Sequence, residues 1–473
     1  MSTAVVVGSG PNGLAAAVLL AREGVDVTVL EAADTIGGGT RTSELTPGLL
    51  HDHCSATHPM AAGSPLLREL DLERHGLRWR LPEIDCVHPL DTGEAGVLHR
   101  SPEKTAHGLG PVDGPRWQRL FGPLTDRFDD LADGILGPLA RVPRHPLVLA
   151  RFGIPALLPA AAVAGLWRGD AARALFGGVA AHVFRPLEKP ATAAIGLSII
   201  AAGHRHGWAV AEGGSRAITD ALAALLTELG GRIETGVHVR TAAQLPPADA
   251  VLFDTAPRAV ADILGDRLPP RVARAYRRYR HGPAAYKADF AVEGGVPWTN
   301  EEARRAGTVH LGGTFEEIAA AERDVHAGRL PERPFVLVGQ QYLADPGRSR
   351  GDVHPVWTYA HVPHGYDGDA SEAIVRQIER FAPGFRDRIV GRAQRSPAGF
   401  EAYNPNYVGG DIVGGANTLL SLVGRPRLTP DPYSTGVPGM YLCSAATPPG
   451  AGAHGMCGAF AARSALRRLR GGA

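Results

Sequence analysis

Three glycines near the start of the chain, Gly8, Gly10 and Gly13, have the G-x-G-x-x-G spacing of a turn that binds phosphate. In such a turn the first glycine permits the tight bend, the second lets backbone amides approach a pyrophosphate, and the third lets a helix pack on the sheet. Pro11 suits the first helical position, because its missing N–H would have had no partner there. The Glu31 carboxylate follows about 20 residues later, where it can accept hydrogen bonds from a ribose. These residues predict a dinucleotide site.

A second glycine cluster, DTIGGGTRT (34–42), follows Glu31 closely and extends the predicted site. No arginine comes directly after Glu31 to hold a 2′-phosphate, which disfavours NADP and leaves NAD and FAD. The cluster suggests another close approach of the backbone to the ligand, with an arginine against a phosphate or a ribityl oxygen. By itself it could also be a flexible turn. Beyond the fingerprint glycines and Glu31, the predicted binding residues are Pro11, Asn12, Gly37, Gly38, Gly39, Thr40 and Arg41.

A third cluster, Gly450, Gly452, Gly455 and Gly458, lies in PPGAGAHGMCGAFAARSALRRL (448–469), where the last helix should begin. Each interior helical glycine costs about 1 kcal/mol relative to alanine, so a close approach of the backbone to another group must compensate. Beyond Gly455 the apolar residues recur at helical spacing, which predicts a helix that packs on one side.

These motifs need elements that position them, and the surrounding sequence supplies such elements. MSTAVVVGSG (1–10) predicts a buried strand, a helix then runs up to Gly24, and VDVTVL (25–30) predicts a second strand, which completes a βαβ unit. Further along, glycines 213 and 214 precede a predicted helix with Ser215 as its N-cap. Segments 232–240 and 248–257 are then predicted as strands.

Composition excludes several classes of protein. The 473 residues suffice for two or three packed lobes, and 49 Lys+Arg against 48 Asp+Glu give no reason to expect nucleic acid as a partner. The N-terminus lacks the basic segment of a signal peptide, and the apolar stretch 153–167 is interrupted by prolines and shorter than the roughly 20 residues of a membrane span. The four cysteines lack metal-ligand or paired spacing, which predicts free thiols, no metal site and a cytoplasmic location.

The remaining segments predict a second lobe. Residues 96–204 have a helical pattern, whereas 276–399 contain three strand-like runs, at 284–292, 334–343 and 353–362, and a helix over 371–382. We therefore expect an α/β protein with a Rossmann-type domain built from 1–95, 205–275 and 400–473, and a substrate lobe built from 96–204 and 276–399. The Ala/Leu/Pro-rich stretch 146–167 could wall an apolar tunnel, rest on a membrane surface, or simply pack within the lobe.

Taken together, the motifs resemble the FAD-dependent oxidoreductases similar to phytoene desaturases, within the amine-oxidase-like flavoproteins. The resemblance covers nearly the whole chain and depends on the three glycine clusters, HDHCSATHP (51–59), GWAVAEGGSRAITDAL (207–222) and GMYLCSAATPPGAGAHGMCGAFAA (439–462). It implies that FAD is the cofactor, that Val239 pairs with the adenine, and that the terminal motif returns to cover the flavin. The further binding residues that it implies are Ser444, Pro449, Gly450, Gly452, Ala453, His454, Gly455 and Met456.

The resemblance implies hydride transfer from a C–C or C–N bond of an apolar substrate to flavin N5. Because no second G-x-G-x-x-G follows a strand, we expect oxygen or a quinone as the electron acceptor. His454 and His58 are the candidate proton acceptors, although each could instead be hydrogen-bonded into the cofactor shell. Three alternatives remain: an amine oxidase, for which Tyr403 and Tyr407 could frame the substrate, a non-redox isoprenoid or lipid carrier, and a flavin-dependent isomerase.

Overall fold

The apolar run at the start of the chain forms the central strand of a five-stranded parallel sheet, in which strands from three distant parts of the sequence lie side by side. This arrangement confirms the predicted α/β fold with a Rossmann-type sheet built from discontinuous strands. The computed structural model describes residues 2–139 and 141–471. In spatial order the strands are β16 (Met440–Leu442), β10 (Ala250–Phe253), β1 (Thr3–Val7), β2 (Asp26–Leu30) and β9 (Arg232–Glu234).

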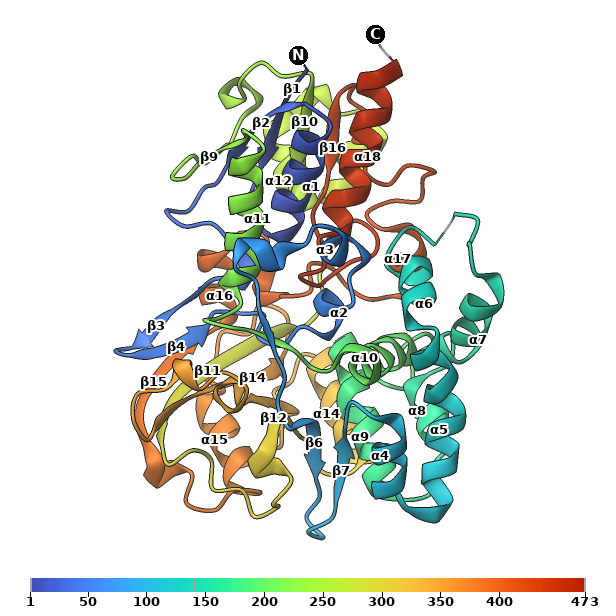
Figure 1. Cartoon of the computed structure of the whole chain (residues 1–473), viewed down its shortest axis with the longest axis vertical. Helices are drawn as coiled ribbons and strands as arrows, with labels where there is room; N and C mark the ends of the chain where they lie inside the picture. The colour runs from blue at the N-terminus through green and yellow to red at the C-terminus, as the bar shows by residue number, and fades with distance from the viewer. Residues whose placement is uncertain (1, 140, 472–473) are drawn as a thin grey trace.

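Helices cover both faces of this sheet, so β1 is buried on each side (Figure 1). Ala4 and Val6 pack beneath the helices of one face, whereas Val5 and Val7 pack against those of the other, as the alternation of side chains along a strand requires. On the first face, α1 (Pro11–Arg22) lies between α11 (Arg216–Glu228) and α18 (Met456–Gly471). The second face is covered by α12 (Pro257–Leu264) and α13 (Pro270–Arg277).

The second sheet has seven strands and is mixed, because only the β12–β6 pair is parallel. It lies in the lower half of the molecule in Figure 1. In spatial order its strands are β15 (Ile389–Arg395), β11 (Ala284–Glu293), β14 (Val353–Val362), β13 (Val336–Gly339), β12 (Ala306–Leu311), β6 (Ile84–Pro89) and β7 (Ala95–Leu98). Two short antiparallel pairs accompany the large sheets: β3 (Thr42–Thr46) with β4 (Leu49–Asp52), and β5 (Trp79–Arg80) with β8 (Val210–Ala211).

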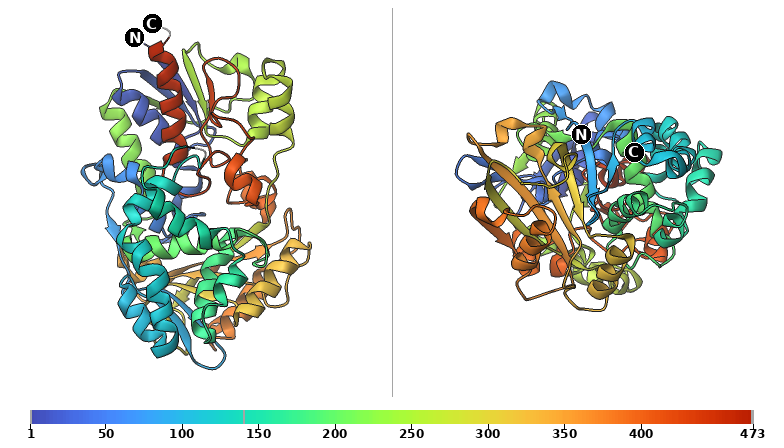
Figure 2. Two further views of the ribbon diagram at one scale, coloured as in Figure 1. Left: turned by 90° about the vertical axis from the view of Figure 1, so that its right-hand side faces the viewer. Right: turned by 90° about the horizontal axis from the view of Figure 1, so that it is seen from below.

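The stretch predicted as helical forms a layer of helices beside the second sheet (Figure 2). Its members are α4 (Pro102–Gly108), α5 (Gly110–Asp126), α6 (Phe128–Ile135), α7 (Pro146–Ala156), α8 (Ala160–Ala164), α9 (Asp170–Ala180) and α10 (Ala193–His206). The other helices are α2 (Pro59–Ala62), α3 (Pro65–Glu69), α14 (Phe315–His326), α15 (Ser371–Glu379), α16 (Pro397–Tyr403) and α17 (Leu419–Gly424).

Several predicted strands are shorter in the structure than their sequence patterns indicate; the strands expected over 1–10 and 248–257, for example, are limited to β1 and β10. The strand expected over 232–240 ends at Glu234, because Gly236 takes a left-handed conformation with φ 74° that a strand cannot contain. The strand expected over 334–343 is limited to Val336–Gly339 and continues as a 3-10 turn. In addition, β6 lies within the segment 1–95 but pairs in the second sheet, so we propose that the first segment of the Rossmann-type domain ends before β6.

Within the described residues, no helix combines the length and the apolar character that crossing a bilayer requires. The four cysteines are buried free thiols. Burial raises the pKa of the Cys457 thiol to about 12, so this residue is not an activated nucleophile.

Candidate cofactor and substrate site

A cavity of about 990 Å³ opens at the carboxyl ends of the parallel strands and continues toward the second sheet. Gly8 follows β1, Glu31 follows β2 and Asp254 follows β10, and all three residues line the cavity. Ligands of open α/β sheets bind at this edge, where backbone amides and helix N-termini converge. The volume falls within the range of about 300–1,000 Å³ that is typical of ligand sites. This end of the cavity is called the nucleotide end below.

Most residues predicted to bind the cofactor line this cavity, although they come from four separated segments of the chain. The predicted residues that line it are Gly8, Gly10, Pro11, Asn12, Glu31, Gly38, Gly39, Thr40, Arg41, Val239, Ser444, Pro449, Gly452, Ala453 and His454. Those that do not contribute to its wall are Gly13, Gly37, Gly450, Gly455 and Met456. The candidate histidine His58 also lines it.

Several of the glycines serve packing between helices. A Cβ at Gly13 would lie 2.1 Å from the Gly8 carbonyl oxygen, which agrees with the predicted pressing of α1 on the sheet. A Cβ at Gly458 would lie 1.8 Å from the Asn12 carbonyl oxygen, and one at Gly455 would lie 2.9 Å from the Ala15 Cβ. Gly458 therefore compensates for its helical cost by letting α18 pack closely on α1, and Gly455 permits a close approach just before α18 begins.

The Glu31 carboxylate is held by four donors from three loops. Its Oε2 accepts hydrogen bonds from the Ser9 amide at 2.9 Å and the Ser9 hydroxyl at 2.6 Å, and its Oε1 accepts from the Ala33 amide at 2.9 Å. The Arg41 Nη2 donates to Oε1 at 3.1 Å and to the Thr35 carbonyl at 2.8 Å. Arg41 was expected against a phosphate or ribityl oxygen; in the structure it fixes the orientation of Glu31 and also reaches the cavity wall.

Asp254 lies in the middle of the nucleotide end and was missed by the sequence analysis. Its Oδ2 accepts a hydrogen bond of 2.9 Å from the Gly13 amide, and a Cβ at Gly10 would lie 2.7 Å from that same oxygen. Burial, together with the charge of Glu31, raises the Asp254 pKa to about 7. Asp254 directly follows β10, as Glu31 directly follows β2. This similarity of position within the sequence could have identified Asp254.

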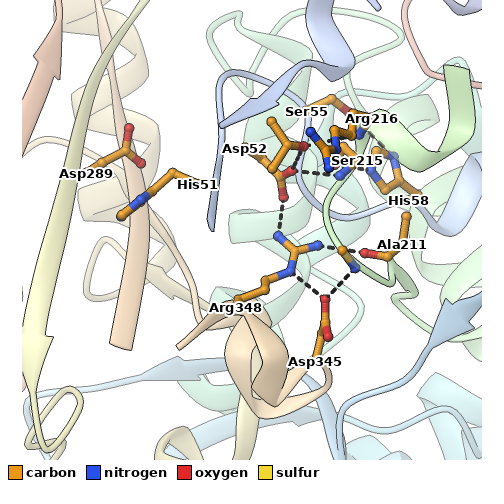
Figure 3. A network of polar contacts seen from close by, with 12 residues as sticks. His51, Asp52, Ser55, His58, Ala211, Ser215, Arg216, Asp289, Asp345 and Arg348 are labelled. Atoms are coloured by element: carbon orange, nitrogen blue, oxygen red, sulfur yellow. Dashed lines mark hydrogen bonds and ion pairs between the residues drawn. The ribbon is translucent and has the colours of Figure 1, made fainter. Parts of the chain in front are cut away.

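His58 is hydrogen-bonded into a buried polar network (Figure 3). Its Nε2 lies 2.8 Å from the Ser215 Oγ, and the Ser215 amide donates to the Asp52 Oδ1 at 2.7 Å. Ser215 does precede α11 as predicted, but its hydroxyl makes no capping bond and contacts His58. Burial lowers the His58 pKa to about 4, so the imidazole is neutral at physiological pH.

Arg348 joins the other side of this network. Its Nη1 donates to the Asp52 Oδ2 at 2.6 Å, its Nε to the Asp345 Oδ2 at 3.0 Å, and its Nη2 to the Ala211 carbonyl at 2.7 Å. Burial opposes ionisation of Asp52, but the Arg348 guanidinium and the bonds from Thr42 and Ser215 keep its pKa below the usual value. The network fixes the relative positions of β4, the N-terminus of α11 and the 346–348 turn.

His454 shapes the start of α18. Its Nδ1 accepts a hydrogen bond of 3.1 Å from the Met456 amide, and its carbonyl accepts one of 2.7 Å from the Ser64 hydroxyl. The backbone amide of Met456, one of the predicted cofactor-binding residues, is therefore already hydrogen-bonded within the protein. Burial lowers the His454 pKa to about 4, and Nδ1 must be unprotonated to accept, so Nε2 carries the proton.

Beyond the nucleotide end, the cavity continues as an apolar chamber between α7, α10, α17 and the second sheet. Its aliphatic and phenyl lining consists of Leu136, Leu149, Phe152, Ala156, Leu157, Ile195, Ile199, Leu419, Leu422 and Val423. The aromatic residues Phe184, Trp208, Trp357 and Tyr359 close the side that faces the second sheet. His182, which the sequence analysis also missed, lines the cavity and lies 3.4 Å from His310 between the Nε2 atoms.

The two tyrosines considered as a frame for an amine contact the second glycine cluster. The Tyr403 hydroxyl donates to the Gly38 carbonyl at 2.6 Å, and a Cβ at Gly39 would lie 2.0 Å from the Tyr407 hydroxyl. Both rings line the cavity, but these contacts make them supports of the 37–39 loop.

Comparison with known proteins agrees with this architecture. The model of an NAD(P)-binding Rossmann-like domain matches residues 6–70. Pyridine nucleotide-disulfide oxidoreductase domain-containing protein 2 of Rattus norvegicus is 23% identical, with 99% of this chain and 94% of the relative aligned. Hydroxyneurosporene desaturase of Cereibacter sphaeroides is 28% identical over 95% of this chain and 94% of its own length.

Among solved structures, wild-type putrescine oxidase bound to putrescine superposes with a TM-score of 0.61. It is 18% identical, with 99% of each chain covered, so the likeness shows a shared fold. The chain therefore carries a Rossmann-like dinucleotide-binding domain, is similar over 95% of its length to a hydroxyneurosporene desaturase, and shares its fold with the putrescine oxidase structure.

Proposed function

We propose that the chain is an FAD-dependent desaturase or dehydrogenase that oxidises a C–C or C–N bond of an apolar organic substrate, with oxygen or a quinone as the final acceptor. The observation that carries this proposal is the continuity of one cavity, which joins the glycine-lined nucleotide end to the apolar chamber. Distant homology to the hydroxyneurosporene desaturases supports it.

Independently of the comparisons with known proteins, the residues of the nucleotide end are compatible with FAD. Gly10 and Gly39 line the cavity with backbone atoms alone, and an added Cβ would lie 2.7 Å from the Asp254 Oδ2 or 2.0 Å from the Tyr407 hydroxyl. In the described part of the chain, the Asn12 Oδ1 and the Thr255 Oγ1 are buried and lack a hydrogen-bond partner, and both residues line the cavity. Buried polar atoms without partners are costly, and the hydroxyls of a dinucleotide would satisfy them.

When bound, the flavin supplies an acceptor for a hydride at N5. The chain supplies an apolar chamber that excludes water and orients the substrate C–H bond. His58 and His454 are neutral cavity-lining residues, and each is held by a hydrogen bond within the protein, with the Ser215 hydroxyl and with the Met456 amide respectively. Of the two roles considered for them, these contacts favour positioning over proton transfer.

The charge of the chamber favours a neutral substrate over an amine. Among the described residues, the carboxylates that line the cavity are Glu31 and Asp254, and both lie at the nucleotide end. A protonated amine in the apolar chamber would thus have no carboxylate to compensate for its lost hydration. The absence of a carboxylate from the lining of the apolar chamber, among the described residues, thus favours a desaturase over an amine oxidase.

Purification and FAD reconstitution test the proposal. We expect a yellow protein whose flavin is reduced by light under anaerobic conditions and reoxidised by oxygen or a soluble quinone. Gly10→Ala should weaken FAD binding, whereas Gly108→Ala, where a Cβ would meet nothing within 4 Å, should not. A colourless protein after incubation with FAD would overturn the proposal. Turnover of amines with release of peroxide would favour the amine oxidase, and absence of any reoxidation would favour the carrier.

A further inference from the structure

Arg425 is a buried cation on the wall of the cavity that has no carboxylate beside it. In the described part of the chain three arginines are buried, and the other two, Arg41 and Arg348, form ion pairs with buried carboxylates. Arg425 is 3% exposed, yet no carboxylate oxygen of a described residue lies within 4.0 Å of its guanidinium nitrogens. A buried charge is costly unless an opposite charge compensates for it. The position of Arg425 therefore calls for an anionic group that the ligand brings.

Uncharged acceptors hold the Arg425 guanidinium in place. Its Nε donates to the Ser421 carbonyl at 3.1 Å, its Nη1 to the Ala445 carbonyl at 3.4 Å, and its Nη2 to the Asn417 Oδ1 at 2.8 Å. Each terminal nitrogen carries a second N–H, and these two groups have no acceptor among the described residues. The guanidinium is thus fixed before a ligand arrives and retains donors for it.

A second arginine without an ion pair binds the same asparagine. The Arg185 Nη1 donates to the Asn417 carbonyl at 2.8 Å, and the side chain of Asn417 accepts from Arg425. Like Arg425, Arg185 has no carboxylate oxygen of a described residue within 4.0 Å. Burial lowers the pKa of Arg185, because water hydrates this charge incompletely as well. Two guanidinium groups on one residue repel each other, and a nearby anion would offset that repulsion.

Arg425 lies where the apolar chamber meets the loop that leads into α18. It directly follows α17, from which Leu419, Leu422 and Val423 line the chamber. On its other side a Cβ at Gly450 would lie 2.8 Å from the Arg425 Nη1, so the absence of a side chain there makes room for the guanidinium. The phosphates of FAD are expected at the glycine fingerprint, and the hydrogen bonds of Arg425 involve no residue of that loop. The free donors of Arg425 therefore suit a ligand in the chamber better than a cofactor phosphate.

We propose that Arg425, assisted by Arg185, binds the carboxylate of a substrate whose remainder is an apolar chain, and that this chain fills the chamber. A guanidinium and a carboxylate form strong charge-assisted hydrogen bonds, and the aliphatic lining provides the apolar contact. A head group held at one end of the chamber sets the distance of each C–H bond from it, so Arg425 acts as a positioning residue that selects the bond to be oxidised. The role of the ligand as a substrate rests on the proposed function; its binding does not.

Calorimetric titration of the full-length protein, reconstituted with FAD, with decanoate and 1-decanol at pH 8 tests the carboxylate site. An apolar chamber alone would favour the uncharged alcohol, whereas we expect the wild type to bind decanoate more tightly. Arg425→Gln should weaken decanoate binding by about tenfold to a hundredfold and leave the affinity for 1-decanol unchanged, which also shows that the chamber is folded. Arg427→Gln is the matched control, because Arg427 donates to the Ser434 carbonyl and does not line the cavity. This control should bind both probes like the wild type.

A wild type that prefers 1-decanol overturns the inference, and so does an Arg425→Gln variant that still prefers decanoate. If that variant also binds FAD more than tenfold more weakly, the arginine serves the cofactor. If Arg425→Gln does not fold, Arg185→Gln decides, because it should weaken decanoate binding at least about threefold, and an unchanged affinity overturns the inference. A wild type that prefers decanoate but whose bound flavin cannot be reduced would refute the proposed function and leave the carboxylate site intact.

Discussion

The Asp254 carboxylate accepts a hydrogen bond of 2.9 Å from the Gly13 amide, inside the loop that the glycine fingerprint builds for a pyrophosphate. An acid in a phosphate cradle must be neutral or must repel the ligand. Burial and Glu31 raise the Asp254 pKa to about 7, and the carboxyl is therefore largely protonated in mildly acidic solution. Under the proposed function, we expect the protonation of this one residue to link FAD affinity to pH.

The affinity for FAD should fall as pH rises through about 7. The fall should be about tenfold for each unit by which the Asp254 pKa differs between the free and the FAD-bound protein. Asp254→Asn retains an acceptor for the Gly13 amide and should remove most of this dependence. Titration of the apo protein with FAD at pH 6 and pH 8.5, followed by flavin fluorescence, measures it. Asp262→Asn, an exposed acid on α12, is the control and should titrate like the wild type. Equal pH dependence of the Asp254→Asn variant would contradict the prediction.

The same residue affects folding, with a defined sign. Because the folded-state pKa is raised above that of the unfolded chain, Asp254 stabilises the fold fully below the unfolded value near 4, and this contribution is lost as pH rises through about 7. The free energy of unfolding of the apo wild type, relative to that of Asp254→Asn, should therefore fall between pH 5 and pH 8 in urea titrations. No change over this interval would show that the buried acid is ionised throughout, and a rise would contradict the direction of the pKa shift.

Arg348→Met should destabilise the protein by about 3–5 kcal/mol, because Asp52 and Asp345 would remain buried without their counter-ion. The Arg348 side chain is 1% exposed and that of Asp52 is 0% exposed, so water cannot replace the guanidinium. Arg74→Met, which removes an exposed pair with Asp71, should change stability by less than about 1 kcal/mol. Chemical denaturation of the wild type and the two variants measures their free energies of unfolding. Equal losses for Arg348→Met and Arg74→Met would contradict a stabilising role of the buried network.

Gly458→Ala should separate α18 from α1, because the added Cβ would lie 1.8 Å from the Asn12 carbonyl oxygen. The expected loss of stability is about 1–3 kcal/mol or more, as for other overpacked sites. Gly108→Ala in α4, which has open space for the methyl group, should be neutral or slightly stabilising. Thermal melts suffice, and equal melting temperatures for the two variants would refute the packing role.

His454→Asn should preserve the start of α18, whereas His454→Leu should cost about 1 kcal/mol, because only asparagine retains a side-chain acceptor for the Met456 amide. If His454 is only a positioning residue, the asparagine variant should also retain the pH profile of flavin reoxidation. A profile that changes with His454→Asn while stability stays constant would instead support a role in proton transfer.

Local sequence patterns were sufficient for the βαβ unit, because its strand, glycines, helix and Glu31 all lie within the first 31 residues. The network around Asp52 was not predictable in this way. Its partner Arg348 follows 296 residues later, in a turn with no distinctive pattern. Asp254 was missed for a similar reason, since only the pairing of β10 beside β1 places it next to Gly13.

The contact between α1 and α18 also constrains how the protein matures in the cell. A wall of the cofactor cavity is formed by the residues that lead into α18, and these leave the ribosome more than 400 residues after the glycine fingerprint. A nascent chain that has folded its first βαβ unit thus presents an unfinished pocket. Under the proposed function, stable capture of FAD is expected only after nearly the whole chain has been translated.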